Sequence, residues 1–176
     1  FSSFSNIYEF GCGSGYNLVR FSSLFPNKNI VGLDWSLSSV DLVNKFSKFN
    51  NLKIRGEYFD FFKPNYDISF PNSTVVFTQT ALEQVGNNFK DFLDFLIQKK
   101  PGLCVHIEPI VELYDLKVSS GKLAYDYSLK RNYLSGFLPE LQRQEKKGYI
   151  KIVDIRRTNS GGLYHESSLL VWKPLI

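Results

Sequence analysis

The sequence Glu9-Phe10-Gly11-Cys12-Gly13-Ser14-Gly15 links a short apolar run to a helical pattern. The run predicts a strand over residues 6–10, and the pattern predicts a helix over residues 16–25 that ends before Pro26. Glycine has no Cβ atom, so the turn between them can adopt positive φ angles and let a ligand approach its backbone. We therefore predict a ligand site at this turn, at the carboxyl edge of a sheet.

The spacing of these glycines narrows the kind of ligand. A dinucleotide-binding turn usually has the spacing G-x-G-x-x-G and holds a pyrophosphate at the N-terminus of the following helix. Here the third glycine comes only two residues after the second. This spacing favours a ligand without a pyrophosphate.

The rest of the chain alternates β-rich runs with helical patterns. Further strands are predicted over residues 29–34, 52–55, 74–78 and 103–107, and helices over 36–49, from 87 or 88 up to Pro101, and over 121–147. Pro139 should kink or restart the last of these helices. Two final apolar runs, 149–156 and 163–172, flank a polar loop at 158–162 and predict an antiparallel hairpin.

This order of elements predicts an α/β fold. We expect a doubly wound, seven-stranded, mostly parallel sheet with an antiparallel C-terminal hairpin strand and helices on both faces. A chain of 176 residues fits one domain, so residues 1–176 are assigned to a single domain. Phe1 is not an initiator Met and a strand begins almost at once, which suggests that residues are missing upstream.

Composition and charge argue against several classes of protein. Hydrophobic residues make up 43% of the chain and charged residues 22%, as in ordinary globular proteins. The net charge of +4 comes from basic residues spread along the chain, so nucleic acid is a poor candidate partner. No apolar run approaches the ~20 residues of a membrane-spanning helix. Cys12 and Cys104 lack C-x-x-C or metal-type spacing, which indicates a reducing compartment, and we expect a cytoplasmic protein.

A carboxylate about twenty residues beyond the glycine turn is the second signal. The predicted strand at 29–34 ends in Gly32-Leu33-Asp34-Trp35. An acid at this place can accept hydrogen bonds from both hydroxyls of a ribose. Taken alone, Asp34 is also explained as an acidic residue beside the N-terminus of the next helix.

Together these motifs resemble the class I S-adenosylmethionine-dependent methyltransferases, which have a Rossmann-like fold and the first motif E/D-x-G-x-G-x-G at this turn. The resemblance spans nearly the whole chain, from Tyr8 to Trp172, and implies S-adenosylmethionine as the cofactor. It implies that Asp34 binds the ribose and that Trp35 packs near the adenine. The residues of the first motif that it assigns to cofactor binding are Glu9, Gly11, Cys12, Gly13 and Gly15.

The same resemblance predicts an adenine contact after the third strand. Family members place there an acidic residue, which hydrogen-bonds the adenine amino group, beside an apolar neighbour. Asp60 with Phe61 is our choice for this pair. Glu57 with Tyr58 fits almost as well, and an aromatic cluster at this place is also typical of a protein core.

The fourth strand ends in Thr78-Gln79-Thr80-Ala81-Leu82-Glu83-Gln84, where the family places residues close to the methyl group. The resemblance thus assigns Thr78 and Gln79 to cofactor binding. The segment lacks the Asn-Pro-Pro-Tyr motif of amino-methylating nucleic-acid enzymes and is closer to the H-x-L-E-H segment of small-molecule methyltransferases. Gln79 or Thr80 stands where that His is expected, which argues against a histidine base at this position.

Two titratable residues end the fifth strand. His106 and Glu108 lie two residues apart, so their side chains should point the same way on an extended strand. We expect these two residues, with Glu83, to be the catalytic residues. Two alternatives stay open: a histidine at a strand end is often structural, and the three side chains together could hold a divalent metal, although we expect no metal.

We expect methylation of an oxygen atom on a small molecule, such as a carbohydrate or another polar metabolite. An acceptor hydroxyl then requires a base to remove its proton. Tyr125, Tyr127, Arg131 and Tyr133 lie where an inserted helix would cover the acceptor pocket, or they form an ordinary solvated helix. Two other functions remain as alternatives: an RNA methyltransferase, and a non-catalytic module that binds S-adenosylmethionine.

Overall fold

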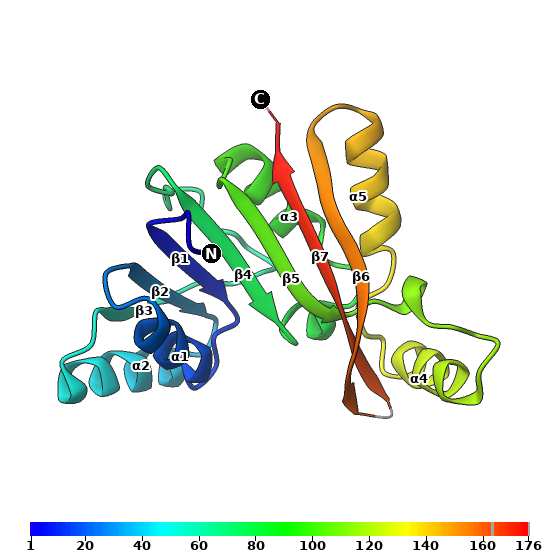
Figure 1. Ribbon diagram of the computed structural model, residues 1–176, viewed down its shortest axis with the longest axis horizontal. Helices are drawn as coiled ribbons and strands as arrows, with labels where there is room; N and C mark the ends of the chain where they lie inside the picture. The colour runs from blue at the N-terminus through cyan, green and yellow to red at the C-terminus, as the bar shows by residue number, and fades with distance from the viewer. Residues whose placement is uncertain (163, 176) are drawn as a thin grey trace.

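The computed structural model describes residues 1–162 and 164–175, and these form a seven-stranded sheet with the order β3-β2-β1-β4-β5-β7-β6 (Figure 1). The strands are β1 (Asn6–Phe10), β2 (Asn29–Asp34), β3 (Ile54–Tyr58), β4 (Thr74–Gln79), β5 (Leu103–Pro109), β6 (Ile150–Gly162) and β7 (His165–Pro174). Strands β1 to β5 pair in parallel, and β7 pairs antiparallel with both β5 and β6. The predicted fold class is confirmed.

Helices cover both faces of this sheet. They are α1 (Tyr16–Leu24), α2 (Leu37–Asn50), α3 (Lys90–Lys99), α4 (Ser119–Lys130) and α5 (Phe137–Lys146), with the short 3-10 helices η1 (Leu82–Val85) and η2 (Val111–Leu113). On one face, Leu18 of α1 and Val43 of α2 share an apolar cluster with Ile7 of β1. On the other face, Phe92 of α3 shares a cluster with Phe10 of β1. Strand β1 is therefore buried on both sides, as a central strand of a parallel sheet should be.

The glycine turn lies at the carboxyl edge of the sheet, as predicted. Strand β1 leads directly into Gly11, whose N–H donates to the carbonyl oxygen of Leu33 in β2 at 2.7 Å. Helix α1 then begins at Tyr16. Because parallel strands end at the same edge, the residues that follow β2, β4 and β5 are gathered near this turn.

Strand β3 starts later than the predicted range of 52–55. The hydroxyl of Ser47, near the end of α2, donates to the carbonyl oxygens of Leu52 and Ile54 at 2.9 and 2.6 Å. These bonds hold the intervening residues in the turn after α2, so pairing with β2 begins at Ile54 and continues to Tyr58.

The C-terminal hairpin is longer than the sequence predicted. The expected polar loop at 158–162 is wrong, because β6 continues to Gly162, which pairs with His165 of β7. A β-bulge after Arg157 accommodates this polar stretch. The guanidinium of Arg157 also donates twice to the carboxylate of Glu166 on the neighbouring strand, at 2.7 and 2.5 Å. Residue 163, where the second apolar run was predicted to begin, lies outside the described residues.

The helical stretch predicted at 121–147 consists of two helices, α4 and α5, separated by residues 131–136. The chain restarts at Gly136, which has a φ of 80° and precedes α5. Pro139 lies in the first turn of α5 rather than at the break. A proline is tolerated there because N–H groups of the first turn have no partner within the helix.

Replacing Gly32 with Ala should destabilise this fold. Gly32 lies in β2, and a Cβ atom on it would be 2.4 Å from Cδ1 of Leu18 and 2.7 Å from Sγ of Cys12. Overpacking of this kind costs about 1–3 kcal/mol, so urea denaturation of Gly32→Ala should show a free energy of unfolding lower by that amount. Gly162→Ala is the control, because nothing lies within 4 Å of its added Cβ. Equal losses in the two variants would contradict this account of the packing.

Candidate functional site

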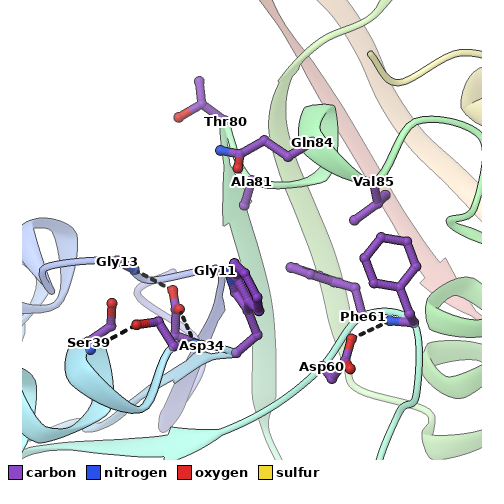
Figure 2. A pocket seen from close by; sticks show the side chains of 13 residues that line it. Gly11, Gly13, Asp34, Ser39, Asp60, Phe61, Thr80, Ala81, Gln84 and Val85 are labelled. Carbon is purple, nitrogen blue, oxygen red and sulfur yellow. Dashed lines mark hydrogen bonds between the residues drawn. The ribbon is translucent and has the colours of Figure 1, made fainter. Parts of the chain in front are cut away.

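A hollow of about 510 Å³ opens at the carboxyl edge beside the glycine turn. Figure 2 shows its walls, which come from the ends of β1, β2 and β4 and from the segment after β3. The structure thus brings most of the predicted cofactor residues to one place. Those that line this hollow are Gly11, Gly13, Asp34, Trp35, Asp60 and Phe61.

Two glycines of the turn face the hollow, and a different physical reason explains each of them. Gly11 has a φ of 73°, and a Cβ atom on it would lie 2.4 Å from Cβ of Ala81. Gly13 has a φ of 52°, and nothing lies within 4 Å of the position that its Cβ would take. Gly11 therefore allows the turn to pack closely against the end of β4, and Gly13 leaves the hollow open.

Asp34 points toward the glycine turn. Its Oδ2 accepts a hydrogen bond from the N–H of Gly13 at 2.8 Å, and its Oδ1 accepts one from the N–H of Ser36 at 2.9 Å. The side chain is buried at the wall of the hollow. A carboxylate has about four acceptor positions, so two remain for a ligand. The dashed lines in Figure 2 show how this residue ties the turn to the start of α2.

Aromatic side chains flank Asp34 on the same hollow. Trp35 is 71% exposed, whereas Phe61 is buried and packs edge-on against Phe92 with ring centroids 4.8 Å apart. Asp60 lies next to them, and its Oδ1 accepts from the N–H of Phe62 at 2.8 Å. The alternative pair lies elsewhere, because Glu57 and Tyr58 belong to β3 and the Glu57 carboxylate is bonded to Arg55 at 2.6 Å.

A second hollow of about 430 Å³ adjoins the first, and the two share Gly11, Gly13, Thr80 and Gln84. Glu9 lies in it almost completely buried, with Oε1 accepting from Nδ2 of Asn17 at 2.8 Å. Its Oε2 has no hydrogen-bond partner among the described residues. Burial raises the pKa of the Glu9 carboxyl to about 7. This edge of the site therefore holds an acceptor oxygen that lacks a donor.

Sequence reasoning missed several residues of the second hollow. Asn17 and Arg20 line it from the first turns of α1, and Gln84 lines it from η1. The two helical residues lie three apart, so they share one face directly after the glycine turn. That spacing could have predicted their place in the site. No sequence pattern could have predicted Gln84, because its position depends on how the chain turns after β4.

Five predicted cofactor residues do not line the first hollow: Glu9, Cys12, Gly15, Thr78 and Gln79. Cys12 belongs to the second hollow, but its thiol is buried, and burial raises the pKa of this thiol to about 12. Gly15, at a φ of 80°, caps the start of α1. Thr78 is fully buried within β4, and neither it nor Gly15 lines either hollow, whereas Gln79 lines the second.

The end of β4 makes a sharp turn. Thr80 has a φ of 49°, a left-handed conformation that costs a β-branched residue about 1–3 kcal/mol. Its N–H donates to the carbonyl oxygen of Ile107 in β5 at 3.1 Å. This turn directs Ala81 and Gln84 toward the hollow, as Figure 2 shows.

His106 is fully buried within the sheet, and both its ring nitrogens are engaged. Nε2 accepts from the indole N–H of Trp172 at 2.9 Å, and Nδ1 lies 2.9 Å from Oγ1 of Thr78. Because an indole only donates, these contacts assign the ring proton to Nδ1, which donates to Thr78. Burial lowers the pKa of His106 to about 3. The ring is thus a neutral bridge between β7 and β4, and it lines neither hollow.

Glu108 lies beneath the turn after β4. Its Oε1 accepts from the N–H of Ala81 at 3.2 Å, and its Oε2 accepts from the N–H of Glu83 at 3.3 Å. Burial raises the pKa of Glu108 to about 7 against these bonds, which lower it. The carboxylate therefore holds the start of η1 in place.

The side chain of Glu83 faces the C-terminal hairpin. Its Oε2 lies 3.4 Å from Nδ1 of His165 at the start of β7. Burial raises the pKa of the Glu83 carboxyl, and the neighbouring imidazole opposes this rise. The three residues predicted as catalytic therefore lie at one edge, but Glu83 pairs with His165 rather than with His106.

Within residues 1–162 and 164–175, no group of three or more His, Cys, Asp or Glu side chains is arranged to hold a metal ion. No helix in the same ranges combines the length and apolarity required to cross a membrane.

The chain matches no known protein-family model and no curated protein sequence. Solved structures do resemble it. The O-methyltransferase NcsB1 from neocarzinostatin biosynthesis, solved with S-adenosylmethionine and 2-hydroxy-5-methyl naphthoic acid, has a TM-score of 0.71 at 13% identity. That match covers 99% of this chain and 50% of NcsB1, so this chain spans about half the length of that protein.

Two further structures show the same likeness. The methyltransferase domain of bacterial CtHen1-C has a TM-score of 0.70 at 15% identity, over 98% of this chain and 90% of that one. Human N-acetylserotonin methyltransferase in complex with S-adenosylmethionine has a TM-score of 0.66 at 17% identity, over 98% of this chain and 48% of that one. The chain has the Rossmann-like fold of the class I S-adenosylmethionine-dependent methyltransferases.

Proposed function

We propose that this protein is an S-adenosylmethionine-dependent methyltransferase that acts on an oxygen atom of a small molecule. The observation that carries the proposal is the carboxylate of Asp34, which is bonded to the N–H of Gly13 at the wall of an open hollow of about 510 Å³. Support also comes from the neighbours solved with S-adenosylmethionine, which share this fold at low identity.

The residues of the first hollow fit an adenosyl group. Asp34 would accept hydrogen bonds from the ribose hydroxyls with its two remaining acceptor positions. Trp35 and Phe61 would contact the adenine, because flat rings pack well on flat ligands. Asp60, which follows β3 on the same wall, would accept from the adenine amino group.

The second hollow fits the amino-acid end of the cofactor. Glu9 has a buried oxygen without a donor, and an ammonium group is the donor that such a carboxylate requires. Arg20, on the same hollow, would pair with a carboxylate. When bound, S-adenosylmethionine supplies a methyl group on a positively charged sulfur. Between the two hollows, Thr80 and Gln84 would border the position of that group.

The acceptor is assigned here only as a hydroxyl-bearing small molecule. This class includes carbohydrates, other polar metabolites and the aromatic acceptors solved with neighbouring structures, such as apigenin. Glu108 serves this reaction as a positioning residue, since it accepts from the N–H groups of Ala81 and Glu83, and His106 supports it by holding Thr78 at the end of β4. The chain mainly aligns the reactants, and alignment alone contributes a large part of such a rate enhancement.

Asp34→Asn should weaken binding of S-adenosylhomocysteine, the product form of the cofactor. The change removes the charge that would bind the ribose, and hydrogen bonds to a charged group are worth about 1.5–3 kcal/mol each. Isothermal titration should therefore show a dissociation constant about 10- to 100-fold higher than that of the wild type.

Asp41→Asn is the matched control, because Asp41 is exposed on α2 and forms a surface ion pair with Lys45. Its dissociation constant should equal that of the wild type. Tight binding of NAD by the wild-type chain, with no binding of S-adenosylhomocysteine, would defeat the proposal.

Glu9 should make the stability of the protein depend on pH. Its pKa is raised in the folded state, to about 7, so the folded protein binds more protons than the unfolded chain, and stability falls as the pH rises through that range. Between about pH 5 and pH 8, the free energy of unfolding of the wild type should fall by on the order of 2 kcal/mol more than that of Glu9→Gln. Urea denaturation at both pH values measures this, and parallel curves for the two proteins would contradict it.

A further inference from the structure

Methylation of a hydroxyl requires a proton acceptor. The structure offers a histidine for this role that the sequence analysis did not propose. The chain has two histidines. His106 is locked inside the sheet by Thr78 and Trp172. The other histidine is His165, at the start of β7.

The register of the sheet places His165 at the edge that carries the glycine turn. Strand β7 runs antiparallel to β5, and its Ser167 pairs with Pro109, the last residue of β5. His165 comes before Ser167 in β7, so it lies beyond the carboxyl end of β5. Figure 1 shows the last part of β6 and the first part of β7 extending past the other strands on the side of α4.

Glu83 connects His165 to the wall of the cofactor hollow. Glu83 and Gln84 belong to the same short helix, η1, and Gln84 lines both hollows. The Oε2 atom of Glu83 is buried and has no hydrogen-bond partner among the described residues, and it lies 3.4 Å from Nδ1 of His165. A carboxylate beside Nδ1 favours the tautomer with the proton on that nitrogen, which leaves the lone pair of Nε2 free to accept a proton. Such contacts are often long before substrate binds.

Aromatic rings surround this imidazole. The ring centroids of Tyr127 and Tyr133 lie 5.2 and 5.5 Å from that of His165, and Tyr164 packs on Tyr127 at 4.8 Å. These side chains are only partly buried, so faces remain available to a flat ligand.

Charged groups near the imidazole come from each neighbouring element. Glu83 faces it from η1, the guanidinium of Arg131 lies over the ring of Tyr127, and the next residue of β7, Glu166, is neutralised by Arg157. The charged group that contacts the imidazole directly is therefore the Glu83 carboxylate.

We propose that His165 is the general base of the reaction, that Glu83 is its positioning residue, and that the acceptor is an aromatic hydroxyl compound whose ring packs against Tyr127 and Tyr133. This inference rests on the proposed function. The acceptor O–H bond breaks and its proton passes to Nε2 of His165. The acceptor oxygen forms a bond to the methyl carbon while the carbon–sulfur bond breaks and its electron pair stays on sulfur. The products are the methyl ether and S-adenosylhomocysteine, and the imidazolium releases its proton to water.

The test compares two acceptors that differ in their need for a base. In neutral water 2-naphthalenethiol ionises readily, whereas 2-naphthol keeps its proton, so only the naphthol requires a base. Methyl transfer from S-adenosylmethionine to each probe is measured for the wild type, His165→Gln and Glu83→Gln, and S-adenosylhomocysteine binding is measured by titration. Lys173→Gln, an exposed change in the same strand, is the control.

His165→Gln should lower kcat for 2-naphthol by about 100-fold or more, the usual contribution of a general base, and should change kcat for the thiol less than about threefold. Glu83→Gln should show the same selective loss at about one tenth of that size. Equal losses with both probes, or no loss with the naphthol, would overturn the assignment. So would a wild-type chain that binds S-adenosylhomocysteine but methylates neither probe. Failure of the wild type to bind S-adenosylhomocysteine would instead refute the proposed function.

Discussion

The hydrogen bond from the N–H of Gly13 to the carboxylate of Asp34 is the constraint on which the rest of the site depends. It joins the ends of β1 and β2, two strands that are already paired over their length. Because the carboxylate also accepts from Ser36, the same side chain fixes the start of α2. The shape of the hollow is thus set by one buried acid whose remaining acceptor positions face outward.

A second set of hydrogen bonds fixes the backbone on the other side of the site. The indole of Trp172 in β7 donates to His106, His106 contacts Thr78 in β4, and Glu108 accepts from the backbone at the start of η1. These contacts cross three neighbouring strands. They fix the residues on both sides of Thr80, which lines both hollows and has a left-handed backbone that is strained for a β-branched residue.

The parts of this structure that the sequence predicted are those set by local patterns. The glycines of the turn, the acid that ends β2 and the buried strands each follow from spacing within a few residues. The roles of His106 and Glu83 did not follow in this way, because each depends on a partner in β7, far along the chain. The register of the strands determines which side chain contacts a histidine at a strand end. A bulge or a longer hairpin changes that register, and no local sequence pattern predicts the change.

Under the proposed function, separate parts of the chain bind the cofactor and the acceptor. The glycine turn, Asp34 and Glu9 all come from the first fifty residues, whereas His165, Tyr127 and Tyr133 come from the last third. Strand β6 returns the chain to the carboxyl edge and β7 begins there, so a late segment reaches the edge that carries the glycine turn. Evolution can therefore change the far end of this hairpin and the helix beside it, and so exchange one partner molecule for another, while the early half stays as it is.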